Sequence, residues 1–208
     1  MLFSFRMTFC RDHWRALRYL PFMHCFKEWQ IICEALRDGK QSVILRKGGI
    51  HEGKDGFSFG NIPEFVLFPT RFHAQGSLVN LDGEFTPGKE WEVDDEVIFD
   101  TLCRVEATYE LTDWEQVASL QHLHLWSEDC IKDRFDWEGK GMASGKIHLA
   151  LIRAYRLPTP LSVSYSKRLG GCRSWVTLDE LTAEVDTLTP VISDEAFNAI
   201  QSELSTLG

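Results

Sequence analysis

Residues 96–111 and 149–156 carry the strongest strand signals of the chain and limit the folds open to it. The first stretch interleaves β-branched and aromatic residues with charged ones, and the second is an apolar run entered through Ile147 and His148. Both patterns are typical of strands in a packed sheet. Shorter strands are expected at residues 42–46, 64–68, 162–165 and 174–178. Pro69 is expected to close the second of these, and Pro158 and Pro160 to end the strand at 149–156.

Amphipathic spacing predicts helices around these strands. The first helix is expected to end at Gly39 and to present one apolar face made of Phe26, Trp29, Ile32, Cys33 and Leu36. Asp113 and Ser193 are suitable N-caps for two further helices, whose apolar faces are Trp114, Val117 and Leu120 in one, and Phe197, Ile200 and Leu204 in the other. Residues 122–131 are interpreted as helical or turn-like, and residues 74–96 as an acidic, turn-rich surface loop.

The order of these elements is helix, strands, helix, strands, helix, with few βαβ units. It predicts an α+β fold with a curved or barrel-like mixed sheet and flanking helices, and it argues against a doubly wound sheet. We expect residues 23–208 to form a single globular domain. Residues 1–22 hold four arginines against one aspartate and are interpreted as an N-terminal extension, either disordered or a misassigned start.

Composition excludes several classes of protein. With 44% apolar and 25% charged residues over 208 positions, the chain has enough apolar material for a core of its own. No apolar run approaches the ~18–20 residues of a membrane span, so no membrane partner is expected. The net charge of −9 argues against a surface that is basic throughout, but leaves room for a local basic groove. The six cysteines are scattered, which is typical of buried thiols in the reducing cytoplasm.

Two basic runs rich in glycine are candidate binding segments, one at residues 46–54 and one at residues 167–173. Backbone N–H groups at glycines, with Arg or Lys beside them, can hold phosphates, and Tyr165 or Trp175 can stack on a base. If the runs meet in space they form a phosphate-and-base groove, and otherwise they are two solvated turns. The candidate nucleic-acid-binding residues are Arg46, Lys47, His51, Arg71, His73, Lys167, Arg168, Arg173 and Trp175.

Metal binding has less support in the sequence. His122 and His124, with Cys130 nearby, resemble part of a zinc site, but the neighbouring leucines and Trp126 favour a packed segment. No metal or other cofactor is expected.

Catalytic patterns are also incomplete. The pairs Glu52–Lys54 and Glu138–Lys140 have a spacing found in metal-dependent nucleases, yet both lie in glycine-rich loops and not on strands. Cys172 is interpreted as structural. Glu28 and Glu34 are interpreted as solvated or helix-end charges.

Several runs resemble a bacterial family known only as a domain of unknown function, the one numbered 1802. They are Glu28-Trp29 with Glu34-Ala35-Leu36, residues 45–50 with Glu52, Phe68-Pro69-Thr70 with His73, residues 123–126, Arg153 with Tyr155-Arg156-Leu157, and residues 170–175. Together they cover about residues 24–200. No established activity attaches to the family, but some of its relatives are linked to restriction-type endonuclease domains, which implies a role near DNA handling.

The order of elements also resembles PUA-like barrels of the ASCH and EVE types. In those barrels a helix followed by Gly-Lys leads into a strand that ends in a basic residue, as residues 35–46 do here. A later strand with a proline-containing exit precedes a short Gly-Trp strand, and residues 153–175 are similar. The resemblance implies a domain that binds RNA or modified bases in DNA.

These observations predict a nucleic-acid-binding module without catalysis, for RNA or modified DNA and associated with restriction-modification. Two alternatives stay open. The first is a metal-dependent nuclease-type enzyme that uses Glu52 and Lys54 or Glu138 and Lys140. The second is a protein-interaction domain in which the acidic body and exposed aromatic residues face a partner.

Overall fold

The computed structural model describes residues 18–47, 62–183 and 188–207. Six strands form one path in the sheet, and a short seventh pairs beside it. They are β1 (Arg18–Trp29), β2 (Val43–Lys47), β3 (Glu64–Thr70), β4 (Glu96–Leu111), β5 (Ile147–Ser164), β6 (Trp175–Ala183) and β7 (Thr189–Pro190). The helices are α1 (Gln30–Arg37), α2 (Trp114–Ser119), α3 (Glu128–Phe135) and α4 (Asp194–Leu204).

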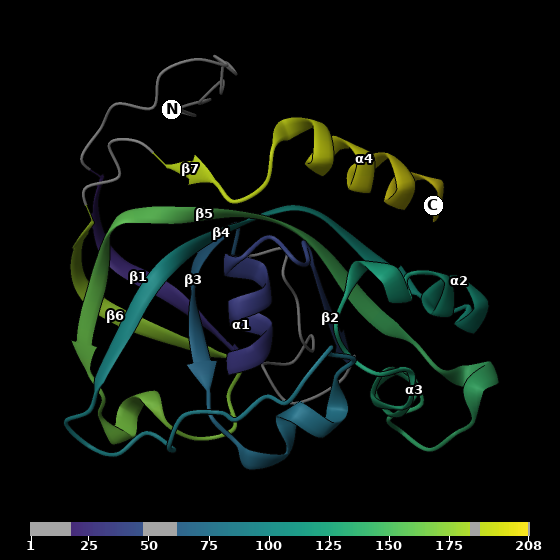
Figure 1. Ribbon diagram of the computed structural model, residues 1–208, viewed down its shortest axis with the longest axis horizontal. Coiled ribbons are helices and arrows are strands. Elements are labelled where there is room, and N and C mark those ends of the chain that lie inside the picture. The colour runs from purple at the N-terminus through teal and green to yellow at the C-terminus, as the bar shows by residue number, and fades with distance from the viewer. Residues whose placement is uncertain (1–17, 48–61, 184–187, 208) are drawn as a thin grey trace, which may run out of the picture.

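The sheet is mixed and strongly curved (Figure 1). Its order is β2-β5-β4-β3-β1-β6, with β7 paired to β5. β1 runs parallel to β3, and the other neighbouring strands are antiparallel. Within the described strands the path does not close, since β2 and β6 are its two ends. The predicted α+β class with a curved mixed sheet and flanking helices is therefore confirmed.

Both faces of the central strands are buried, which gives the protein two hydrophobic clusters. Phe26 and Phe65 lie in the cluster that also takes up the apolar faces of the helices. Cys25 and Val66, their neighbours in the chain, lie in the second cluster on the other side of the sheet. None of the described helices has the length and apolar character needed to span a membrane.

Two helix starts follow the capping prediction. Asp113 accepts a hydrogen bond from the N–H of Glu115 before α2, and the Ser193 hydroxyl accepts one from the N–H of Ala196 before α4. Phe197 and Leu204 of α4 are buried as expected. The long strand predicted at residues 96–111 matches β4, and residues 122–131 contain a 3₁₀ turn (Gln121–Leu123) and the start of α3.

The first predicted helix is partly wrong. Phe26 and Trp29 belong to β1, and only residues 30–37 are helical. Phe26 pairs with Leu67 of β3 on one side and Trp175 of β6 on the other. A strand that is buried on both faces lacks polar alternation, so its apolar residues also matched the spacing of a helix. The boundary expected at residue 23 lies inside β1, and residues 1–17 lie outside the described part of the chain.

The strands also continue through prolines that were expected to end them. Pro69 lies inside β3, where its carbonyl accepts a hydrogen bond from the indole N–H of Trp91. Pro158 and Pro160 lie inside β5, in a stretch where the pairing with β4 jumps from Arg156 to Leu161. Among the described strands, β4 pairs with none of the residues between Arg156 and Leu161, so the missing N–H groups of the two prolines break no pairing with β4.

Candidate functional site

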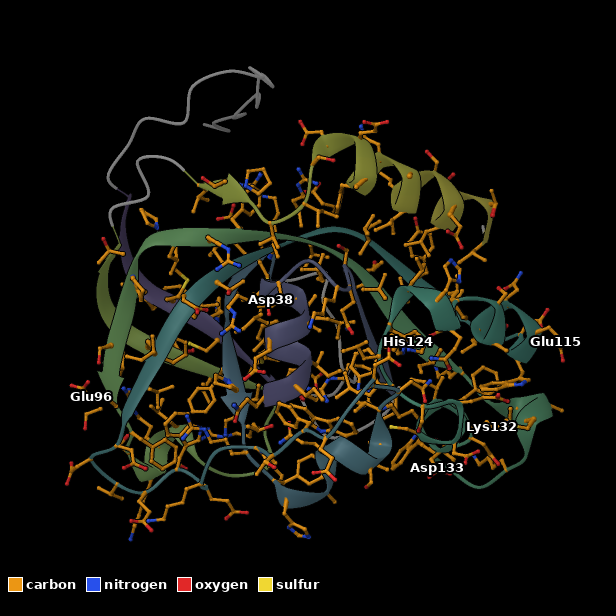
Figure 2. The ribbon with its side chains drawn as sticks, in the orientation of Figure 1. Asp38, Glu96, Glu115, His124, Lys132 and Asp133 are labelled. Carbon is orange, nitrogen blue, oxygen red and sulfur yellow. The ribbon has the colours of Figure 1, made fainter. Side chains whose placement is uncertain are left out.

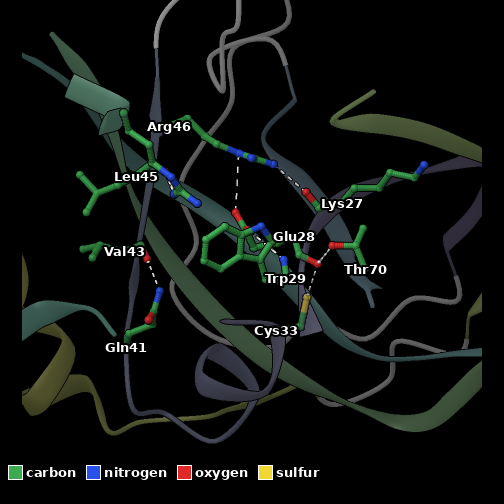
Figure 3. Close-up of polar contacts among 10 residues, drawn as sticks. Lys27, Glu28, Trp29, Cys33, Gln41, Val43, Leu45, Arg46 and Thr70 are labelled. Atoms are coloured by element: carbon green, nitrogen blue, oxygen red, sulfur yellow. Dashed lines mark hydrogen bonds and ion pairs between the residues drawn. The ribbon is translucent and has the colours of Figure 1, made fainter. Parts of the chain in front are cut away.

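Lys27 of β1 connects the two segments that the sequence marked as basic. The guanidinium of Arg46 donates from Nη2 to the Lys27 carbonyl at 2.6 Å (Figure 3). The Lys27 N–H donates to the carbonyl of Ser174 at 2.8 Å, and its Nζ donates to the carbonyl of Gly171 at 3.0 Å. The Arg46 side chain and the loop before β6 therefore both contact Lys27, whereas residues 48–54 of the first run lie outside the described residues.

The loop at residues 167–173 displays its cations on a fixed backbone. Residues 167–169 form a 3₁₀ turn whose Leu169 is buried in the second cluster and anchors the loop. Gly171 has φ +79°, a conformation that favours glycine. Lys167, Arg168 and Arg173 are exposed, and Arg173 donates from Nη2 to the Arg168 carbonyl at 2.8 Å. No acidic residue occurs in this loop.

Lys27 is electrostatically coupled to this loop although it is only 7% exposed. Burial lowers the pKa of Lys27, the positive charge of Arg173 lowers it further, and Cys172 acts in the opposite direction. The Lys27 ammonium also lies 5.5 Å from the centre of the Phe68 ring. An anion placed between Lys27 and Arg173 would relieve the repulsion between them.

Arg46 is already engaged inside the protein. Its Nε lies 3.6 Å from Oε2 of Glu28, and its guanidinium lies 4.7 Å from the centre of the Phe26 ring. Within the described residues neither Arg46 Nε nor Glu28 Oε2 has a hydrogen-bond partner, so the interaction between them is an ion pair without a hydrogen bond. Glu28 Oε1 accepts from the N–H of Trp29 at 2.8 Å.

Glu28 is thus a buried carboxylate on a strand, and its interpretation as a solvated or helix-end charge is wrong. Its side chain is fully buried. Arg134 of α3 also interacts with it, donates to the Leu45 carbonyl at 2.8 Å and lies 4.8 Å from the centre of the Trp29 ring. Burial lowers the pKa of Arg134, and the charge of Glu28 opposes that effect. The buried Glu28 carboxylate therefore interacts with two cations, Arg46 and Arg134.

Arg71 lies at the end of a row of stacked side chains that leads to the same loop. Its guanidinium lies 3.4 Å from the centre of the Trp91 ring, and Trp91 stacks on Tyr165 with centroids 6.4 Å apart. Arg71 donates to the carbonyl of Lys89 at 3.2 Å. His73 is exposed two residues further on, at the start of a 3₁₀ turn (His73–Leu78).

The remaining candidates of the basic runs have different surroundings. Trp175 packs on the rings of Phe26 and Phe65, with centroids 4.8 and 5.2 Å away. Lys47 points to Trp137, and its Nζ lies 4.8 Å from the centre of that ring. His51 and the pair Glu52–Lys54 lie outside the described residues.

A cleft of about 290 Å³ lies between α1, the end of β3 and the start of β4. Arg37, Arg71, Glu34, Glu96 and Asp100 line it together with apolar side chains. Arg37 forms an ion pair with Asp100 at 3.8 Å. Because its walls carry charges of both signs, the electrostatics of this cleft favour neither an anionic nor a cationic ligand.

The metal-site pattern does not converge in space. The His122 ring is exposed and lies 3.0 Å from a Glu203 oxygen, whereas His124 is buried near the Gln121 amide. Among the described residues no group of three or more His, Cys, Asp or Glu side chains is arranged to hold a metal ion.

Glu138 and Lys140, whose spacing is found in metal-dependent nucleases, form an exposed ion pair on a loop. Their side-chain N and O atoms are 2.6 Å apart. The cysteines at 25, 33, 103 and 130 are buried, as interpreted from their scatter, whereas Cys172 is exposed in the basic loop.

Buried His124 should make stability depend on pH. Burial lowers its pKa to about 4, and the nearby charge of Arg134 acts in the same direction. An unfolded histidine titrates near ~6.5, so between about pH 6.5 and 4 the unfolded chain binds the extra proton and stability falls as the pH falls. The expected loss is about 3 kcal/mol over that interval.

Urea denaturation of the wild type and a His124→Gln variant at pH 7, 5.5 and 4 would measure this effect. The variant should show a flatter dependence on pH. Equal slopes for the two proteins would show that His124 is not the group responsible.

Three residues of this region had not been singled out from the sequence. Lys27 lay in the supposed helix, where nothing marked it as buried. Arg134 needed the position of α3 beside β2, which is not a local property. Trp137 did carry a signal, because a tryptophan between Asp136 and Glu138 in a glycine-rich turn is typical of an exposed ring.

The chain is similar to three solved structures of the ASCH protein from Zymomonas mobilis, of which two are point mutants. Each is 14% identical to it. One mutant and the unmutated protein each give a TM-score of 0.40, the first covering 87% of this chain and 95% of the other, the second 86% and 94%. The other mutant gives a TM-score of 0.39, with coverage of 86% and 96%.

These structures are of the ASCH type, which the order of elements in the sequence resembled. The similarity assigns no role to any residue of this chain. No curated protein matches the sequence. The family model described as Domain of unknown function (DUF1802) matches residues 25–203. The chain therefore belongs to this family, as the runs from Glu28-Trp29 to Trp175 predicted.

Proposed function

We propose that this protein is a nucleic-acid-binding module whose basic loop, residues 167–173, holds the phosphate backbone. The observation that carries the proposal is the position of Lys27, which donates to the Gly171 carbonyl, accepts from Arg46 and is near enough to Arg173 for that charge to lower its pKa. Three exposed cations on a loop without acidic residues give a local positive field on an acidic protein. Lys47, Arg71, His73 and Trp175 are proposed as further contacts of the same ligand.

The chemistry of this site favours binding over catalysis. Arg and Lys side chains and glycine N–H groups recognise phosphate, but they do not by themselves cleave it. The role in restriction-modification that the family resemblance implies makes modified duplex DNA one of the probes, beside RNA.

Fluorescence anisotropy with labelled single- and double-stranded RNA and DNA, including methylated duplexes, would test the proposal. We expect the wild type to bind at least one probe at low salt. The double variant Lys167→Ala/Arg173→Ala should bind it about tenfold more weakly. Its plot of log affinity against log salt should be shallower by roughly 1.5, because two phosphate contacts are lost.

A matched control removes two positive charges elsewhere. Lys40 and Arg156 are exposed, and Arg156 lies 3.6 Å from Asp38 at the end of α1. Figure 2 shows Asp38 well apart from Glu96, where β4 starts beside the basic loop. The variant Lys40→Ala/Arg156→Ala should keep nearly all the affinity. If both double variants lose the same affinity, the loss reflects net charge and not the loop at residues 167–173. A wild type that binds no probe would refute the proposal.

A further inference from the structure

Trp137 is the one tryptophan with an exposed side chain in the part of the chain that the structure describes. It follows α3 directly and is 37% exposed. It stands outside both hydrophobic clusters, whereas Trp126 is fully buried and Trp175 packs on the core. An exposed indole gains from burial against a partner, so its position on the surface calls for an explanation.

The turn that carries Trp137 is held at both ends. Phe135 before it is buried, and its carbonyl accepts a hydrogen bond from the N–H of Lys146 at 2.9 Å. The Asp136 carboxylate accepts from the N–H of Gly141 at 2.8 Å, and its carbonyl accepts from the N–H of Gly139 at 2.9 Å. The ring is therefore presented on a fixed turn, which reduces the entropy lost when a ligand stacks on it.

Trp137 also contacts the first basic segment, at Lys47. The Lys47 ammonium lies 4.8 Å from the centre of the Trp137 ring. Arg46, the neighbour of Lys47 in β2, donates to the Lys27 carbonyl, and Lys27 donates to Gly171 in the basic loop. Arg46 and Lys27 are largely enclosed in the protein, so Lys47 is the cation that stands beside the exposed ring. An aromatic ring with a cation next to it is the combination that binds a base and its phosphate in single strands.

We propose that Trp137 is a stacking platform for an unpaired base, and that the nucleic acid bound by this protein is single-stranded in this region. Lys47, beside the ring, then contacts the phosphate of the stacked nucleotide. The inference rests on the proposed function and adds to it the strand state of the ligand. A duplex keeps its bases stacked on one another, so it offers Trp137 no free base face. Every base has such a face, so DNA and RNA single strands are both candidates.

The test compares four proteins as full chains: the wild type, Trp137→Ala, Trp137→Phe and Met142→Ala. Met142 is an exposed apolar residue of the same loop, 36% exposed, and serves as the matched control. Each is titrated into labelled single strands of DNA and RNA and into hairpin duplexes of the same sequence. Circular dichroism melts check that all four are folded.

We expect Trp137→Ala to weaken single-strand binding roughly tenfold or more, with the duplex affinity and the salt dependence unchanged. Trp137→Phe should retain most of the affinity, and Met142→Ala all of it. If Trp137→Ala binds single strands like the wild type, the platform is refuted. In that case Lys167→Ala/Arg173→Ala still decides the proposed function separately. A wild type that binds no probe refutes both, and a preference between DNA and RNA identifies the source of the strand.

Discussion

Replacing Glu28 by glutamine is expected to lower the free energy of unfolding by about 3–5 kcal/mol. The variant keeps the shape of the side chain and an oxygen that can accept from the Trp29 N–H. It removes the charge that faces Arg46 at 3.6 Å and also interacts with Arg134. Removing one partner of a buried ion pair is costly because the remaining cation stays in the protein interior without a counter-charge.

Urea denaturation followed by circular dichroism measures this loss, with Glu34→Gln as the control. Glu34 lies on α1, is only partly buried and accepts from the Gln30 amide, so its neutralisation should change stability by less than about 1 kcal/mol. The double variant Glu28→Gln/Arg46→Met should lose less than the sum of its two single variants. Strict additivity would show that Glu28 and Arg46 do not stabilise each other.

Gln75→Ala is expected to cost roughly 3–6 kcal/mol, because one buried and two partly buried backbone groups lose their partners together. The side chain is 0% exposed. Its Oε1 accepts from the N–H of Ile31 at 3.0 Å, and its Nε2 donates to the carbonyls of Thr70 and Phe72 at 3.2 and 2.9 Å. One amide therefore connects the start of α1 to the chain on both sides of Arg71.

The measurement is again urea denaturation, with Gln201→Ala on the exposed side of α4 as the control. Amide hydrogen exchange adds a local readout, since the Ile31 N–H should lose protection in Gln75→Ala. A loss below about 1 kcal/mol, with Ile31 still protected, would contradict the assigned role of Gln75.

Most strands were predictable because their signals are local. β4 begins and ends at the predicted residues, since over much of its length buried residues alternate with exposed or partly exposed ones. The caps Asp113 and Ser193 were predictable for the same reason. β1 was not, because the sequence cannot tell that Phe26 pairs with two strands from distant parts of the chain.

The candidate site divides in the same way. The loop at residues 167–173 was recognisable from its glycines and cations, but its contact with Lys27, to which Arg46 also donates, was not predictable from the sequence. The burial of Arg46 against Glu28 was not predictable, since the apparent helix placed Glu28 on a solvated surface. Long-range pairing decides which charges are buried, and local sequence patterns do not reveal that pairing.

The pairing of β1 with β6 has a consequence for the order in which the protein assembles. Phe26 has Trp175 as its partner, so this edge of the sheet joins two segments that are far apart in the chain. Contacts between such distant segments slow folding, because the entropy of closing a long loop is lost before the contacts are gained. During synthesis on the ribosome, β1 cannot pair with β6 until residues 175–183 have emerged. The junction of Lys27 with Gly171 and Ser174 then forms late, so a folding intermediate that lacks β6 also lacks the basic surface.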